Sequence, residues 1–209
     1  MQHLRKLDQN LIFGEFHNQA GIKTFLSTHM NEFYQQGYRI LVGEFNEDLP
    51  IGDLIDDSLQ PESPLKVLLQ KAHDLVMKND QTAPALLNKI EAGLRTGPWL
   101  VQGSDKASFA LLVRTALANR MQVRLFDYIV DPGKKELGSD RVKNYDNDVA
   151  LKLQGLNGKW LDLCGDEHVG GFVRLLGQGV VGFQHADLTT ALTNRTLQNI
   201  QDLEQVPSM

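Results

Sequence analysis

Short apolar runs alternate with amphipathic helical stretches along most of this chain. Five runs have the length and continuity of strands buried on both faces of a parallel sheet, namely 11–15, 39–42, 123–127, 160–164 and 180–183. Between the first two, apolar residues recur at the spacing of one helical face, at Ile22, Phe25, Leu26, Met30 and Phe33, and Gly37 follows as a stop signal. The pattern predicts an α/β fold whose central, mainly parallel sheet is flanked by helices. A right-handed crossover is expected to place the first two strands side by side.

Other helical patterns fill the segments between the later strands. Two of them, over 65–76 and 83–94, predict a helical hairpin inserted beside the sheet at about 65–95, after a long polar loop at 45–64. Ser104 is expected to cap a helix that runs to about Asn119, and further helices are expected over 140–154 and 169–176. A weak strand at 99–101 and a loop at 131–138 complete the pattern. The segment 187–209 predicts a polar helical tail that ends in disorder near Pro207.

Composition narrows the classes of protein to which the chain can belong. Its 209 residues, 42% of them hydrophobic, suit one α/β domain over 1–209 with a sizeable core. The net charge is −5, with 21 basic and 26 acidic residues well mixed, so we expect no nucleic-acid partner. Cys164 is the single cysteine, which excludes an internal disulfide and a cysteine-based zinc site.

The hydrophobic pattern also indicates whether the chain inserts into a membrane and where the protein is located. The N-terminus shows no apolar signal region, and the longest apolar runs are too short to span a bilayer. We therefore expect no signal peptide and no strong membrane attachment. The protein is expected either to be cytoplasmic as encoded or to be a secreted or translocated effector.

Three of the apolar runs end in a glycine that is followed at once by an acid. The pairs are Gly14-Glu15, Gly43-Glu44 and Gly165-Asp166, and two of them add a histidine within three residues of the glycine, at His17 and His168. The carboxyl ends of parallel strands share one edge of a sheet, and ligands bind there. The sequence therefore predicts that these side chains converge on one acid-rich cleft that contains histidine.

Each of these residues has a plainer interpretation beside the functional one. Glu15 can orient the His17 imidazole, both can bind a metal, or both can be solvated at a strand end. Glu44 is expected roughly 5 Å from the end of the first strand if the two strands are neighbours, and is otherwise a surface acid. The segment 165–171 is expected to be a sharp turn whose free amides bind an anion near His168, or a tight loop with exposed acids.

Four other residues are weaker candidates. Arg141 opens a helix and either reaches into the cleft to hold an oxyanion or is exposed. Asp127 is an additional site acid or a cap, and Tyr128 donates a proton or packs. Cys164 is tempting as a nucleophile, but its place inside a strand favours an inert buried thiol. The chain has neither the Gly-x-Ser-x-Gly elbow of serine hydrolases nor a phosphate-binding loop of the Gly-x-x-x-x-Gly-Lys-Ser/Thr kind.

Taken in order, these motifs resemble a known superfamily over about 10–183. The order runs Gly14-Glu15-Phe16-His17, then Glu44, then Arg141, then Gly165-Asp166-Glu167-His168-Val169-Gly170. It is similar to that of the erythromycin esterase, ChaN haem-binding lipoprotein, TraB and TIKI protease superfamily. That superfamily also includes a subdomain of the Pasteurella-type mitogenic toxin and the Ras-cleaving effector domain of RTX-type toxins, and the toxin modules are the nearest in character.

The resemblance implies a ChaN/TIKI-like fold and a cleft lined by Glu15, His17, Glu44 and His168. The matching residues of the superfamily activate water or bind metal, and the residue matching Arg141 assists. This chain departs from the pattern at Asp166-Glu167, where the superfamily has small or neutral residues. The two added acids favour metal binding or a basic substrate.

We interpret the chain as a hydrolase, most of all of a peptide bond, and as a toxin or effector domain. Its substrate is then a protein, and a host small GTPase is one candidate. One histidine, held by Glu15 or Glu44, would be the general base, while the other histidine, Arg141 or turn amides would stabilise the oxyanion. The reaction would need no cofactor, or a divalent metal ion held by the two acids and two histidines. Haem binding through a histidine or tyrosine is an alternative. A third interpretation is a non-catalytic targeting domain that uses 45–64 and 65–95 as its contact surface.

Overall fold

The computed structural model describes residues 5–45, 47–52, 59–96, 104–126 and 138–209, and in 138–141 it describes the backbone only. The predicted strand at 99–101, most of the predicted loop at 131–138, and both Asp127 and Tyr128 lie outside the described residues.

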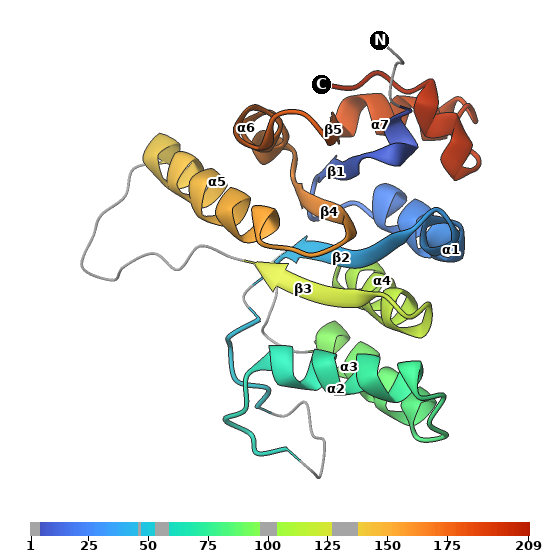
Figure 1. Cartoon of the computed structure of the whole chain (residues 1–209), viewed down its shortest axis with the longest axis vertical. Coiled ribbons are helices and arrows are strands. Elements are labelled where there is room, and N and C mark those ends of the chain that lie inside the picture. Colours follow the sequence, from blue (N-terminus) through green and yellow to red (C-terminus); the bar gives the residue numbers. More distant parts are fainter. Residues whose placement is uncertain (1–4, 46, 53–58, 97–103, 127–137) are drawn as a thin grey trace.

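Five parallel strands form the sheet in the described part of the chain (Figure 1). They are β1 (Asn10–Glu15), β2 (Tyr38–Glu44), β3 (Gln122–Phe126), β4 (Lys159–Gly165) and β5 (Val180–Phe183). Their order across the sheet is β3-β2-β4-β1-β5, and every neighbouring pair is parallel. The predicted α/β fold with a central parallel sheet is confirmed, and the strands fall where the apolar runs indicated.

The predicted pairing of the first two strands is wrong. β4 lies between β1 and β2, with Gly14 opposite Cys164 on one side and Gly43 opposite Leu163 on the other. The crossover through α1 (Gly21–Gln35) therefore skips one position, which a strand from much later in the chain fills. As a result, Glu44 stands two strand spacings from β1, about 10 Å, rather than the expected 5 Å.

Helices cover both faces of the sheet, because alternate side chains of each strand point to opposite faces. Leu11 and Phe13 of β1 pack with α1, α4 (Lys106–Ala118) and α7 (His185–Thr193), whereas Ile12 and Cys164 pack with α5 (Gly138–Gln154) and α6 (Asp166–Leu176). The predicted helical hairpin corresponds to α2 (Leu65–Met77) and α3 (Ala83–Thr96), which lie beside the β3 edge (Figure 1). No helix in the described ranges combines the length and the apolar character needed to cross a membrane.

Three local predictions need correction. The N-cap of α4 is Asp105 rather than Ser104, because the Asp105 carboxylate accepts a hydrogen bond from the Ser108 amide at 3.1 Å. The segment after Gly165 is not a turn, since α6 begins at Asp166 directly after β4. The tail is ordered past Pro207, because Val206 is buried and the Met209 amide donates to the Gly182 carbonyl at 2.9 Å. Ile200–Glu204 forms a short 3-10 helix within that tail.

Candidate active site

The carboxyl edge of the sheet brings together Glu15, His17, Glu44 and His168. Glu15 ends β1 and lies on the α1 face, where His17 follows it, whereas His168 lies in the first turn of α6 on the opposite face. The central strand β4 ends between the two histidines, at Gly165. One imidazole thus comes from each face of the sheet, and both meet over the end of its middle strand.

The His17 side of the site is a chain of charged contacts that begins in the core. The Nδ1 atom of His17 lies 2.9 Å from Oε1 of the buried Glu15, and the other carboxylate oxygen of Glu15 pairs with the buried Lys23 ammonium. Lys23 also donates to the carbonyls of His17 at 3.2 Å and Gln19 at 2.9 Å, which ties the loop to α1. The hydrogen bond to Glu15 raises the pKa of His17, against the opposing effect of partial burial and with a further contribution from Glu44.

The His168 side is a shorter and more buried pair. The Nδ1 atom of His168 lies 2.7 Å from Oδ1 of Asp146 on α5, and both side chains are over nine-tenths buried. The Tyr145 ring covers the imidazole, with the ring centroids 4.2 Å apart. Burial raises the pKa of Asp146, while the hydrogen bond from His168 opposes that rise. A carboxylate in this place fixes the tautomer of the ring and directs Nε2 away from α5.

Glu44 stands between the two imidazoles. Its Oε2 accepts a hydrogen bond from the Gly165 amide at 2.8 Å and lies 3.6 Å from Nε2 of His17, while its Oε1 lies 3.8 Å from Nε2 of His168. A side chain at position 165 would disturb this approach, because a Cβ there would lie 3.3 Å from Glu44 Oε2 and 3.4 Å from His168. Gly165 therefore allows all three side chains to converge.

A cavity of about 20 Å³ adjoins His17 and Glu44 on the α4 side of the sheet. Glu15, Lys23, Ser104 and Asp105 supply its polar lining. That volume accommodates a single water molecule, and the polar lining offers it several hydrogen-bond partners. The site can therefore hold one water molecule beside the Glu44 carboxylate and the His17 imidazole.

The remaining predicted site residues are less involved or fall outside the description. Glu167 lies 3.7 Å from Nε2 of His168, but its side chain is 69% exposed. Arg141 belongs to α5, five residues before Asp146, and its side chain is outside the described part. Asp166, the acid after Gly165, accepts a hydrogen bond from the His185 amide at 2.6 Å and so joins α6 to α7.

Three charged residues at or below the site were missed by the sequence reasoning, although each left a signal. Lys23 lies three residues before Leu26 on the apolar face of its helix, and Asp146 lies three residues before the inward Val149. Asp162 interrupts the apolar run of β4. A charged side chain at a buried position is rare unless it is paired, so Lys23 and Asp146 each indicated a partner inside the fold.

Asp162 and Cys164 lie on the same face of β4, beneath Glu44. Burial and the nearby Glu44 carboxylate raise the pKa of Asp162 to about 7, and its Oδ2 has no hydrogen-bond partner among the described residues. Burial also raises the pKa of the Cys164 thiol, which is fully enclosed. The expectation of a buried cysteine is confirmed, and a protonated, enclosed thiol is a poor nucleophile.

The donor atoms at the site have the chemistry of metal ligands, since both histidines use Nδ1 on a carboxylate and leave Nε2 for another partner. As they stand, however, no three His, Cys, Asp or Glu side chains in the described ranges form a group able to hold a metal ion. Metal dependence therefore stays a prediction for experiment.

Comparison with known proteins gives similarities in structure only. No protein-family model matches the chain. No curated protein matches it in sequence either. It is similar in structure to RRSP, a MARTX toxin effector domain from Vibrio vulnificus CMCP6, with 17% identity and a TM-score of 0.49 over 85% of this chain and 34% of that one. It is also similar to the type III effector HopBA1, with 13% identity and a TM-score of 0.42 over 78% of this chain and 70% of that one. The chain thus spans about a third of the length of the first of these two effector proteins.

Proposed function

We propose that this protein is a hydrolase that activates water between two imidazoles and a carboxylate, and that it acts on a peptide bond. The observation that carries the proposal is the arrangement around Glu44. Both histidines bind a carboxylate through Nδ1, at 2.9 and 2.7 Å, and both approach Glu44 through Nε2, at 3.6 and 3.8 Å. These gaps are too long for direct hydrogen bonds, so a bound water molecule or substrate atom can bridge them.

His168 is the general base in this scheme. Its Nδ1–H donates to Asp146, which leaves the lone pair of Nε2 facing Glu44. A water molecule held by Glu44 gives its proton to that nitrogen as it attacks the carbonyl carbon of the substrate. The attack forms a tetrahedral intermediate, and general-base assistance of this kind contributes about 10²–10⁴-fold in rate.

His17 is the proton donor. Its pKa is raised by the hydrogen bond to Glu15 and by Glu44, so the imidazolium persists to higher pH than in a free histidine. Its side chain is 42% exposed, which allows contact with a substrate, whereas that of His168 is only 6% exposed. When the C–N bond of the intermediate breaks, His17 transfers its proton to the departing amine. Arg141 stays the predicted oxyanion partner.

The proposed substrate is a protein. The sequence resemblance to Ras-cleaving toxin modules makes purified small GTPases the first substrates to test, with a whole-cell lysate as the broader search. New protein termini are identified by mass spectrometry after incubation with the wild-type protein and with His168→Ala. The proposal expects discrete termini that appear with the wild-type protein alone, and the same products with or without a chelator if no metal is involved. Identical sets of termini from both proteins would refute it.

A further inference from the structure

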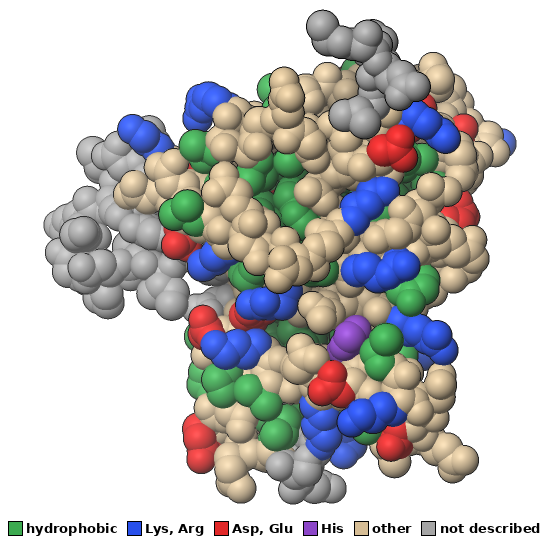
Figure 2. Space-filling view, viewed as in Figure 1, with side chains coloured by type: hydrophobic (Ala, Val, Ile, Leu, Met, Phe, Trp, Pro, Cys, Tyr) green, Lys and Arg blue, Asp and Glu red, His purple; other side chains and the backbone are tan. Residues whose placement is uncertain are grey.

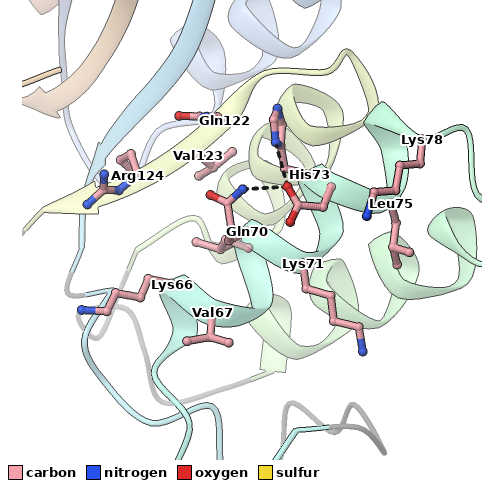
Figure 3. Close-up of a pocket in the computed structure, with 12 residues that line it drawn as sticks. Lys66, Val67, Gln70, Lys71, His73, Leu75, Lys78, Gln122, Val123 and Arg124 are labelled. Carbon is pink, nitrogen blue, oxygen red and sulfur yellow. Dashed lines mark hydrogen bonds and ion pairs between the residues drawn. The ribbon is translucent and has the colours of Figure 1, made fainter. Parts of the chain in front are cut away.

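A groove of about 580 Å³ lies between β3 and α2, and none of the candidate site residues lines it. Figure 2 shows Lys and Arg side chains around this hollow. Two of them, Lys66 and Arg124, lie at one end of the groove (Figure 3). Arg124 donates to the Glu47 carboxylate at 2.6 and 2.9 Å, and Lys66 pairs with Asp48. The charges at this end are thus engaged within the chain, whereas the rim of the candidate active site presents an exposed aromatic ring.

Phe16 is the exposed aromatic residue at that rim. It lies between Glu15 and His17 in the chain, and it is 50% exposed. The chain has nine phenylalanines, and the other eight are buried. An exposed ring forgoes the free energy that burial of apolar surface provides, and a partner that covers the ring recovers it. Phe16 therefore offers an apolar contact directly beside a histidine of the site.

Three contacts fix the position of Phe16. Its ring packs on the imidazole of His185 at the start of α7, with the centroids 4.2 Å apart, and His185 is only 6% exposed. The Phe16 carbonyl accepts a hydrogen bond from the Gln19 amide at 2.9 Å. The carbonyl of the next residue, His17, accepts one from the Asp105 amide at 2.7 Å. A substrate that covers the ring thus has little side-chain freedom to remove, which favours binding.

The order of the strands shows on which side of the reacting groups Phe16 lies. From β2 the order along the sheet is β4, β1 and β5, so Glu44, Gly165 and Glu15 follow one another along its carboxyl edge. His185 comes directly after β5, and Phe16 packs on it, whereas His17 directs Nε2 back toward Glu44. Neighbouring strands are about 4.8 Å apart and an extended residue spans about 3.4 Å. An extended substrate held between Glu44 and His17 therefore reaches Phe16 within two residues.

We propose that Phe16 determines specificity by binding a large apolar side chain on one of the first two residues after the scissile bond. In the proposed mechanism His17 gives its proton to the departing amine, so the substrate beyond His17 is the part that follows that bond. Phe16 has this role only if the hydrolase proposed above is correct, and it narrows the substrates to proteins with such a residue at the cleavage site. Glu15 is buried and paired with His17 and Lys23, so it does not favour a basic side chain at this position.

A peptide library, made by digesting a whole-cell lysate with a protease of known specificity, tests this role. Mass spectrometry identifies the residues on both sides of every bond that the wild-type protein cleaves. Leu, Ile, Met or Phe is expected to be enriched at one of the first two positions after the bond. Phe16→Ala should lose this enrichment and raise KM for the best apolar peptide about tenfold, with a smaller change in kcat, because a binding contact is lost. Phe16→Leu should keep most of the preference.

Leu111→Ala is the matched control, since it shortens another exposed apolar side chain, on α4, and should change neither the enrichment nor KM. Thermal unfolding confirms that each variant is folded. His168→Ala should lose cleavage of every peptide, whereas Phe16→Ala should still cleave, which separates the two proposals. Absence of any cleavage by the wild-type protein would overturn both. Cleavage without apolar enrichment, with Lys or Arg enriched instead, or with the same enrichment in Phe16→Ala would overturn the role of Phe16 alone.

Discussion

The two histidines of the candidate site are held in the same manner but differ in their surroundings. Each places Nδ1 on a carboxylate and directs Nε2 at Glu44, yet His17 is half exposed on the α1 face and His168 is enclosed between α5 and α6. Glu15 is paired with the Lys23 ammonium, whereas the buried Asp146 carboxylate packs against Gly171 of α6 and feels the Arg174 charge only as a lesser influence. In the proposed mechanism, the same hydrogen-bond geometry therefore serves opposite roles, with proton donation on the open side and proton abstraction on the enclosed side.

Removal of the enclosed imidazole should have the largest effect. His168→Ala is expected to lower the rate of substrate cleavage by about 10²–10⁴-fold, because the water molecule loses its base. The measurement is kcat on whichever protein substrate the mass-spectrometric screen identifies. His29→Ala, a histidine outside the site on α1, is the control and should retain full activity. Equal activity of both variants would end the assignment of His168.

Lys23→Met tests the support of the exposed histidine. It would leave the buried Glu15 carboxylate without its cationic partner, so a loss of about 3–5 kcal/mol in the free energy of unfolding is expected. Lys66→Met removes a lysine from an exposed pair with Asp48 and should cost less than about 1 kcal/mol. Urea unfolding of both variants gives the comparison. Similar losses in the two would show that Glu15 does not rely on Lys23.

Gly171→Ala should displace Asp146 without changing any charge. A Cβ at position 171 would lie 1.8 Å from Asp146 Oδ2, so the carboxylate must move away from His168 or α5 must shift. We expect a destabilisation of about 1–3 kcal/mol, as in other overpacked sites, together with a fall in kcat.

The neighbouring Gly170→Ala is a closely matched control, because its nearest contact is the flexible end of Met209 at 3.4 Å. It should be neutral or slightly stabilising, since alanine is the better helix former. If both alanines lower kcat alike, the position of Asp146 does not matter for the reaction.

The smallest expected effect on kcat is a shift of the pH profile in Glu15→Gln, a variant that also breaks the buried pair with Lys23 and is therefore measured at a temperature at which it stays folded. The Glu15 hydrogen bond is the largest cause of the raised pKa of His17, so its loss lowers that pKa. If His17 must be protonated to act, the alkaline limb of kcat moves to lower pH in the variant. The measurement is the pH dependence of kcat for both proteins. A shift of the acid limb instead would mean that His17 is the base and that the two roles are exchanged.

Local sequence patterns predicted the elements of the fold well but their partners poorly. The apolar runs located all five strands of the described sheet, and the glycine–acid pairs located Glu15 and Glu44 at strand ends. The same reasoning paired β1 with β2, because nothing local in 11–15 or 39–42 indicates that β4 separates them. It also expected a carboxylate from Glu15 or Glu44 to hold His168, whereas Asp146 of a distant helix does so.

The sequence by itself therefore determined the position of each strand and placed acids and histidines at or just past the strand ends. It could do so because burial and backbone alternation produce patterns that are visible within a few residues. The tertiary structure alone decided that β4 carries Gly165 between the two histidines, that Lys23 pairs with Glu15 and Asp146 with His168, and that β3 lies at an edge of the described sheet. The physical reason is that strand order and side-chain pairing depend on how the helices pack on both faces of the sheet, which joins residues far apart along the chain.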